Sequence, residues 1–526
     1  MVATEKRMKL VTPKRLILAA LTVMVVALVG SSLLGSLEKP QITNRLELYQ
    51  TNLILSATGM SDAAPETEVQ AQLREAVLGK EPLKTAQEDY QEVRESVQTE
   101  LNGLQTRLKE NPASEVTTEG APTSEILTLV DQQRRLLAQL DLQIGLLQAE
   151  QGEVNAAQQT WEALSDRLRS PRTERDAAIA RTTKTVQGLW NQPPNIEEDA
   201  SSQIETTLEG WFRAVSLERL YEVQQNSAAL TALEGEQEAI AQQTLLKLAV
   251  IGVLPGIAAV TGIGLFIFLV IQRITRGKEA ILSFQATPWE TPWTWETVWQ
   301  VLIVGFFFMG QIVVPLLLSL LHLTFTGVGS SRVRAVYTLV YYLTMASSAL
   351  LVLFFSIRSH RPLPDAWFRY RFQSNWPLWG VGGYLVALPL MLGVSLVNQQ
   401  FWQGQGGSNP LLQIVLEEND PLALGLFLFT AAIAAPIFEE TLFRGFLLPS
   451  LTRYLPASGA IALSSLIFAI AHLSLSEVLP LTALGAILGF VYVRSRNLLA
   501  PILLHCLWNS ITMIGLFILG SGTASN

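Results

Sequence analysis

The stretch FLFTAAIAAPIFEETLFRGFLL, residues 427–448, is apolar enough to lie in a membrane and still carries three ionisable side chains. These are Glu439, Glu440 and Arg444. A charged side chain at the centre of a bilayer costs roughly 2.5 to 3.5 kcal/mol on insertion scales, so such residues persist where they are paired or line a hydrated cavity. The stretch therefore predicts a functional site inside a membrane-spanning helix.

Helix geometry separates the three side chains. Residues four positions apart share one face of an α-helix, so Glu440 and Arg444 can form an ion pair, whereas Glu439 points away from that pair. We therefore predict that Glu440 is the partner of Arg444 and that Glu439 is the freer carboxylate. Two interpretations of the pair stay open, a direct catalytic role and a purely structural ion pair.

Two of the four histidines lie in the next apolar segments. His472 ends the stretch FAIAH (468–472), and His505 begins the stretch HCLWN (505–509). A turn near residues 455 and 456 would place Glu439 and His472 at equal depth, roughly 20 to 25 Å from that turn, so we expect the two side chains to face each other. The same arithmetic places His505 about 10 Å shallower. Its approach then requires tilt, a broken helix or displaced helix ends.

These residue types suit the hydrolysis of a peptide bond. A carboxylate in an apolar cavity can take a proton from water, and an imidazole with an amide, as on the shared face of His505 and Asn509, can donate hydrogen bonds to a developing oxyanion. Alternatively, Glu439, His472 and His505 could ligate Zn²⁺ with one open position. The HExxH pattern of thermolysin-like zinc helices is absent from the sequence. We prefer glutamate-dependent hydrolysis with no certain cofactor, and leave zinc open.

Three short patterns occur in a fixed order on three separate apolar segments: EExxxR at 439–444, FxxxH at 468–472 and HxxxN at 505–509. In this order they resemble the CAAX-processing and bacteriocin-processing (CPBP) family of intramembrane peptidases, which includes CAAX prenyl protease 2 and Abi-type proteins. The resemblance covers about residues 421–519, and we recognise no motif upstream of Phe401.

The resemblance also implies roles for the motif residues. It implies that Glu439 and His472 activate a water for attack on a peptide carbonyl. His505 and Asn509 are implied to stabilise the oxyanion. Glu440 and Arg444 are implied to organise the site, and the eukaryotic relatives imply prenylated CAAX substrates.

The whole chain reads as an all-α, polytopic membrane protein. Its 526 residues are only 16% charged and have a mean hydropathy of +0.30, which is too apolar for a typical soluble enzyme. About nine transmembrane helices are expected, at 16–37, 245–272, 298–322, 336–357, 376–397, 422–454, 458–473, 478–493 and 498–519. The expected domains are a cytoplasmic N-terminus with an anchor helix (1–37), an inserted extramembrane helical domain (38–244), transmembrane helices 2–5 (245–400) and the peptidase module (401–526).

The distribution of Lys and Arg predicts the orientation. Basic clusters follow the second, fourth and eighth expected spans, on the same side as the basic N-terminus, so the positive-inside rule places the N-terminus in the cytoplasm. A cleavable signal is the alternative to a retained anchor at 16–37, but this run is long enough to span a bilayer. Because the single cysteine, Cys506, forbids an intrachain disulfide, we expect a bacterial plasma membrane or a thylakoid-like internal membrane.

The segment 38–244 is expected to form a coiled-coil or TPR-like helical domain. An apolar seam fits helix pairing, and the run 147–164, with Gly152 at a turn and Trp161 beyond it, resembles one TPR-type helix pair. A plain acidic helical bundle is the simpler alternative to a peptide-binding array. The seam residues are Val130, Leu137, Leu140, Ile144 and Leu147.

These observations favour an integral membrane endopeptidase that cleaves membrane-associated peptides or proteins. The alternatives are a catalytically silent scaffold or immunity-type peptide-binding protein, and a transporter, which the lack of an inverted repeat makes less attractive. The expected partners are membrane lipids, a peptide or protein substrate and a candidate protein partner for segment 38–244. The net charge of −8 offers no basic surface, so nucleic acid is not expected as a partner.

Overall fold

The computed structural model describes residues 12–37, 39, 41–59, 78–110, 121–283, 288–323, 330–402 and 404–521. The basic residues of the extreme N-terminus, on which the orientation partly depends, lie outside this range. The described chain is helical throughout, without β-strands, and separates into two compact units. We call Met1–Ile42 with Leu254–Phe517 the membrane unit, and Thr43–Val253 with Ile518–Asn526 the helical unit.

The all-α, polytopic expectation is confirmed. Within the described residues, eight helical stretches are long and apolar enough to cross a membrane. The seventh of the nine expected spans, 458–473, is instead the shorter helix α21 (Ala457–Ile470) of 14 residues. The eight are α2 (Pro13–Ser36), α11 through α12 (Ser227–Glu279), α13 through α14 (Trp295–Leu320), α15 (Ser331–Ile357, with its extension to His360), α16 (Trp376–Trp402), α18 through α20 (Pro421–Leu451), α22 (Leu475–Ser495) and α23 (Leu499–Gly520).

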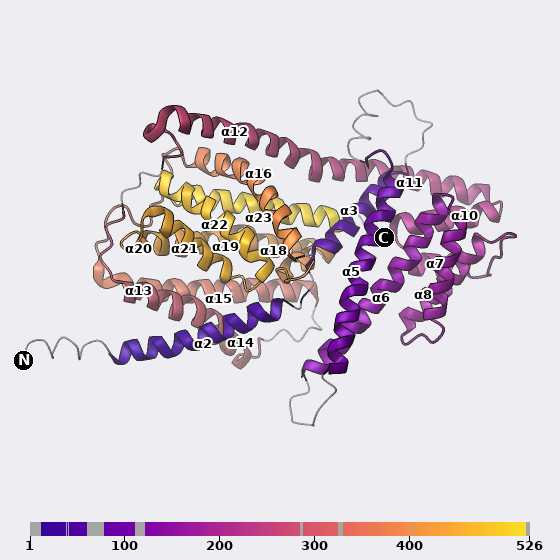
Figure 1. Ribbon diagram of the computed structural model, residues 1–526, viewed down its shortest axis with the longest axis horizontal. Coiled ribbons are helices and arrows are strands. Elements are labelled where there is room, and N and C mark those ends of the chain that lie inside the picture. The colour runs from indigo at the N-terminus through magenta and orange to yellow at the C-terminus, as the bar shows by residue number, and fades with distance from the viewer. Residues whose placement is uncertain are drawn as a thin grey trace, which may run out of the picture. The chain divides into compact units, whose positions relative to one another are not determined.

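Small residues bring α21 and α22 into close contact within the membrane unit (Figure 1). A Cβ placed on Gly485 would lie 2.9 Å from Ser465 Cβ, and one on Gly489 would lie 3.2 Å from Ile461 Cγ2. Such close approach of two backbones is what small residues provide at helix interfaces in membranes. Gly485 and Gly489 therefore serve the packing of these two helices.

The span that carries the ionisable stretch is an interrupted α-helix. It begins as α18 (Pro421–Phe429), widens into the π-helical segment η5 (Thr430–Ala434), continues as α19 (Ala435–Glu439) and widens again as η6 (Glu440–Leu447) before α20 (Leu448–Leu451). π-Helical turns are rare and occur frequently at functional sites. Glu439 is the last residue of α19, Glu440 is the first residue of η6, and Arg444 lies within η6.

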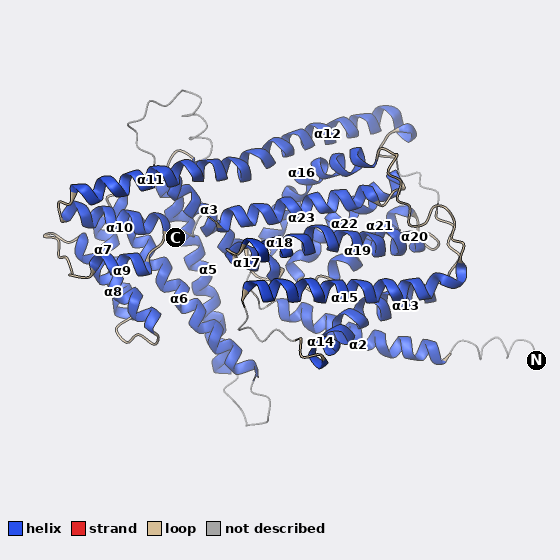
Figure 2. Cartoon of the chain, turned by 180° about the vertical axis from the view of Figure 1, so that it is seen from behind, coloured by secondary structure: helices blue, strands red, loops and turns tan. Residues whose placement is uncertain are grey.

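The helical unit is a bundle of α3 (Thr43–Ala57), α5 (Pro82–Glu110), α6 (Ala121–Glu150), α7 (Val154–Arg167), α8 (Glu174–Leu189), α9 (Ala200–Thr207), α10 (Gly210–Val223) and α11 (Ser227–Leu248), which can be followed in Figure 2. All five residues of the apolar seam are buried in its core. The predicted helix pair is present as α6 and α7, joined at Gly152, whose φ of +81° suits glycine.

Candidate functional site

The predicted ion pair lies at the centre of the membrane unit. Arg444 Nη1 donates to Glu440 Oε1 at 2.8 Å, and both residues are fully buried. Arg444 Nη2 also donates to the carbonyl of Gly485 on α22 at 3.0 Å. The guanidinium carbon lies 4.6 Å from the centre of the Phe468 ring, in cation–π geometry. The spacing argument for Glu440 and Arg444 is therefore confirmed, and the pair joins three helical segments.

His505, on α23, lies between the two adjacent glutamates. Its Nδ1 is 2.9 Å from Glu440 Oε1, and its Nε2 is 3.9 Å from Glu439 Oε2. An ionised carboxylate can only accept, so the short contact assigns the proton to Nδ1. In the neutral imidazole Nε2 is then an acceptor that faces Glu439. A carboxylate that orients a histidine through Nδ1 is a recurrent arrangement in catalytic sites.

His505 lies at the same depth as Glu439, although the sequence analysis placed it about 10 Å shallower. The reason is that α23 does not begin at the level of the turn near residue 455. A Cβ placed on Gly445 would lie 3.2 Å from Leu498 Cδ1, so the residue before α23 packs beside Gly445 and not beside the turn near residue 455. Gly445 is six residues beyond Glu439, and His505 is seven residues beyond Leu498. At 1.5 Å per residue these intervals are about 9 and 10 Å, which brings His505 to the level of Glu439.

Glu439 is held by a residue that the sequence analysis missed. The hydroxyl of Tyr342, on α15, donates to Glu439 Oε1 at 3.0 Å, while Glu439 Oε2 faces His505. The Glu439 side chain is 15% exposed, whereas that of Glu440 is completely buried. Glu439 is thus the more accessible carboxylate, as predicted. A tyrosine hydroxyl within an apolar span was the only available signal for Tyr342.

His472 does not make the expected contact with Glu439. Within the described residues, no hydrogen bond or ion pair joins the two side chains. His472 Nδ1 lies 2.9 Å from the backbone carbonyl oxygen of Phe468, four residues earlier in the chain. The centroids of the His472 and Phe468 rings are 4.8 Å apart. The mirror argument assumed two continuous helices, but α21 ends at Ile470, so His472 lies in the turn that follows. Because its Nδ1 donates to a carbonyl, Nε2 is the nitrogen left for other partners.

Asn509 contacts the backbone of the interrupted helix. Its side-chain Nδ2 donates to the carbonyl of Ala431 at 2.7 Å, within the π-helical segment η5. A widened helical turn changes the partners of its carbonyl groups, and the amide satisfies one of them. The structure therefore ties Asn509 to the helix that carries Glu439. Among the hydrogen bonds of the described residues, none joins Asn509 to His505.

The three candidate zinc ligands do not form a ligand set. Across the part of the chain that the structure describes, no group of three His, Cys, Asp or Glu side chains is placed to hold a metal ion. The geometry of Glu439, His472 and His505 does not fit a zinc centre, so we derive no chemistry through a metal.

Comparisons with known proteins agree with the motif analysis. Residues 421–511 match the family described as type II CAAX prenyl endopeptidase Rce1-like. The chain is 29% identical over 137 residues to the putative membrane peptidase YdiL of Bacillus subtilis, which covers 26% of this chain and 55% of that protein. It is also 29% identical over 143 residues to the membrane-embedded CAAX protease MroQ of Staphylococcus aureus, which covers 26% of this chain and 56% of the relative.

The family match lies in the C-terminal part of the membrane unit. The chain spans about half the length of the curated relatives it matches. No solved structure matches the chain. Tyr342 lies outside the segment 421–511, whereas the six motif residues from Glu439 to Asn509 lie inside it.

Proposed function

We propose that this multi-pass membrane protein, whose residues 421–511 belong to the CPBP family of intramembrane peptidases, is an endopeptidase that cleaves membrane-associated peptides or proteins. The observation that carries the proposal is the series of side chains Arg444, Glu440, His505 and Glu439, each within 3.9 Å of the next. It ends at a carboxylate that is accessible and faces an imidazole nitrogen. This is the arrangement that water-activated hydrolysis requires.

In the proposed reaction Glu439 is the general base. It takes a proton from a water, the resulting hydroxide attacks the peptide carbonyl, and the tetrahedral intermediate expels the amine as the C–N bond breaks. The proton held by Glu439 passes to that amine, so the products are one carboxylic acid and one amine, which then exchange a proton to become a carboxylate and an ammonium group. Glu440 holds His505 so that Nε2 points to the region of the water, and Arg444 pairs with Glu440 in the apolar interior.

The roles of the other motif residues follow their contacts. In the neutral ring of His472, whose Nδ1–H is given to the Phe468 carbonyl, Nε2 can only accept, so we assign it to accept a hydrogen bond from a backbone N–H of the substrate. Asn509 supports the site by holding Ala431 and hence the helix of Glu439. This reaction is glutamate-dependent and needs no metal.

The test is a cleavage assay on the full-length protein in detergent, with a fluorogenic CAAX-type peptide and a set of membrane peptides. We expect Glu439→Gln and His505→Ala each to lower kcat by at least about 100-fold, the usual scale for a general base. His322→Ala, at an exposed helix end, is the matched control and should keep full activity. Chelator should have no effect. Activity that survives Glu439→Gln, or that chelator abolishes, would overturn the mechanism.

A catalytically silent scaffold is the second candidate. The observation that favours it is the position of His472, which is not joined to Glu439 within the described residues. A scaffold would keep its cellular phenotype when Glu439 is replaced by Ala, whereas a peptidase would lose it.

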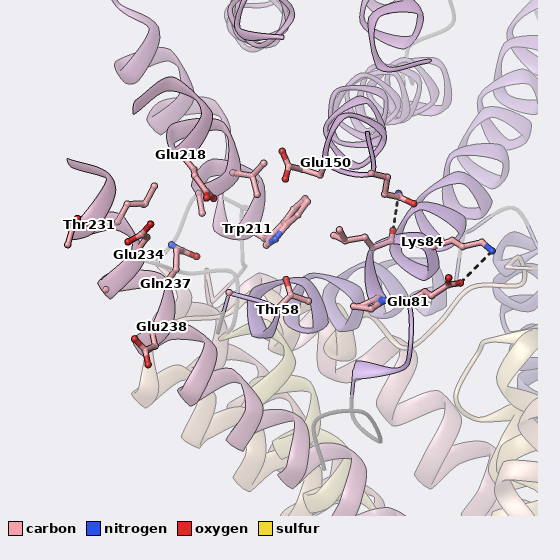
Figure 3. A pocket seen from close by; sticks show the side chains of 18 residues that line it. Thr58, Glu81, Lys84, Glu150, Trp211, Glu218, Thr231, Glu234, Gln237 and Glu238 are labelled. Carbon is pink, nitrogen blue, oxygen red and sulfur yellow. Dashed lines mark hydrogen bonds and ion pairs between the residues drawn. The ribbon is translucent and has the colours of Figure 1, made fainter. Parts of the chain in front are cut away.

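We further propose that the helical unit recruits a partner through a cationic segment. A cavity of about 1000 Å³ in this unit is lined by five glutamates and by one lysine, Lys84, which already pairs with Glu81 at 3.6 Å (Figure 3). Burial, together with the charges of Glu218 and Glu222, raises the pKa of Glu150 to about 7. The mostly buried indole of Trp211 also lines the cavity, and its face suits a Lys or Arg side chain.

Binding of a fluorescent Lys/Arg-rich peptide tests this proposal. The double variant Glu218→Gln/Glu234→Gln should weaken binding at least several-fold and reduce its salt dependence. Glu162→Gln and Glu205→Gln, outside the cavity lining, form the matched control. Equal binding by both double variants would reject the cavity as the partner site.

The orientation stays a proposal as well: a cytoplasmic N-terminus in a bacterial plasma membrane or thylakoid-like membrane, with the helical unit on the opposite side. Cys506 is the single cysteine. In a Cys506→Ser background, Thr231→Cys should therefore react with an impermeant maleimide from outside intact cells. Labelling only after lysis would reverse the orientation.

A further inference from the structure

Tyr342 reaches the proposed active site from a helix that is not part of the matched family segment. It lies on α15, which packs against α18 and η5 of the interrupted span. Its hydroxyl donates to Glu439 Oε1 at 3.0 Å. Its ring packs edge-on against Phe438, the residue before Glu439, with 6.1 Å between ring centroids and an interplanar angle of 84°.

The two oxygens of Glu439 therefore have different environments. Oε1 accepts from the phenol, and Oε2 lies 3.9 Å from His505 Nε2. The terminal torsion of a glutamate is broad, so a carboxylate without such a partner would sample a wide range of orientations. The hydrogen bond from Tyr342 selects the orientation in which one oxygen remains directed at the region of the water.

The surrounding aromatic side chains keep the phenol in place. Phe306, on the π-helical segment η3 (Val301–Val313), stacks on Phe438 at 6.1 Å and packs edge-on against Phe443 at 5.5 Å. Tyr342 is thus in contact with a group of rings on both sides of Glu439 along its helix. A rigid ring that carries a donor restricts its target with little loss of entropy of its own.

We propose that Tyr342 is a positioning residue for the general base. It orients Glu439 and takes no proton from the water or the substrate itself. This inference rests on the proposed function. It extends the site beyond residues 421–511, because a side chain from α15 then belongs to the catalytic arrangement.

The chain offers a matched control on the same helix. Tyr341 is the adjacent residue, and its hydroxyl donates to the carbonyl of Gly310 at 3.0 Å. Tyr341→Phe and Tyr342→Phe each remove one hydroxyl and one hydrogen bond of the same length from α15. Only the second change removes a contact with Glu439, so a general weakening of the helix would affect both variants alike.

The experiment compares kcat and KM of the two variants in the full-length protein. We expect Tyr342→Phe to lower kcat about 10- to 100-fold with KM nearly unchanged, because an oriented hydrogen bond to a charged group is lost. Tyr341→Phe should stay within about twofold of wild type. Equal behaviour of the two variants overturns the inference.

An infrared measurement separates this inference from the proposed function. The carboxylate band that disappears in Glu439→Gln should shift in Tyr342→Phe and stay in place in Tyr341→Phe. If wild type and Glu439→Gln cleave peptides equally, the proposed function fails. If only Glu439→Gln is inactive and the band does not move in Tyr342→Phe, the function stands and Tyr342 has no positioning role.

Discussion

Arg444 and Glu440 form an ion pair, Nη1 to Oε1 at 2.8 Å, with no more than 1% of either side chain exposed. Removing one partner of a buried pair leaves the other charge without compensation, which costs about 3 to 5 kcal/mol. We therefore expect Arg444→Met to lower the thermal unfolding temperature in detergent markedly. Arg332→Met, which breaks the solvent-exposed pair with Asp420, should leave the unfolding temperature almost unchanged. Similar losses in the two variants would contradict this.

Asn509→Leu should loosen the helix that carries Glu439. The variant keeps a comparable volume but leaves the Ala431 carbonyl without its donor, at a cost of about 1 to 3 kcal/mol for a buried group. Thr512→Val is the control, since the Thr512 hydroxyl bonds only to the Trp508 carbonyl of its own helix. Hydrogen exchange of peptides covering residues 427–438 measures the effect. Unchanged exchange in Asn509→Leu would show that the contact does not stabilise η5.

Gly485→Ala should displace α22 from α21. The added Cβ would lie 2.9 Å from Ser465 Cβ and 3.1 Å from Ser465 Cα, where backbone cannot move aside easily. The shift would also move the Gly485 carbonyl that accepts from Arg444, so both stability and cleavage should fall. Gly515→Ala, with open space at the Cβ position, should be neutral or slightly stabilising, as alanine is in most helices. A tolerated Gly485→Ala would mean that the two helices separate at little cost.

Two glutamates make the helical unit sensitive to pH. Burial raises the pKa of Glu100 to about 7, and burial with neighbouring carboxylates raises the pKa of Glu150 to about 7. A carboxyl group whose pKa is higher in the folded state favours folding in its protonated form. The contribution of these two groups to the free energy of unfolding should therefore be largest below about pH 4.5. It should be lost as the pH rises toward 7.

Hydrogen exchange of α5 and α6 in the full-length protein, followed from pH 5 to pH 8 and corrected for intrinsic rates, measures this loss. The double variant Glu100→Gln/Glu150→Gln should flatten the dependence. Glu88→Gln with Glu95→Gln, on α5, is the control. A dependence that survives in the first variant would assign the effect to other groups.

Local spacing predicted the part of the site that lies within one helix. Arg444 lies four positions after Glu440, and that spacing alone was sufficient to predict the ion pair. The membrane spans were also predictable, because their lengths and hydropathy reflect the solvent. His505 was placed in the site on its motif, although its depth seemed wrong until Leu498 was found beside Gly445.

Spacing and hydropathy could not predict which helices contact each other. Nothing in the residues around Tyr342 says that α15 packs against the interrupted span, since any apolar helix could do so. The expected contact of His472 failed because the end of α21 at Ile470 depends on the turn that follows. The π-helical segments were likewise invisible, because their sequence periodicity over so few residues resembles that of an ordinary helix.

The hydrogen bond between Tyr342 and Glu439 limits how far the protein can be shortened from its N-terminal side. A fragment that starts at residue 401 would contain every motif side chain from Glu439 to Asn509. It would also contain the whole segment 421–511 that matches the peptidase family. It would nevertheless lack the phenol on Oε1 and the Phe306 ring beside Phe438. Domain transplants and homology-guided truncations of this protein should therefore begin no later than Trp295, where the helical stretch containing η3 starts.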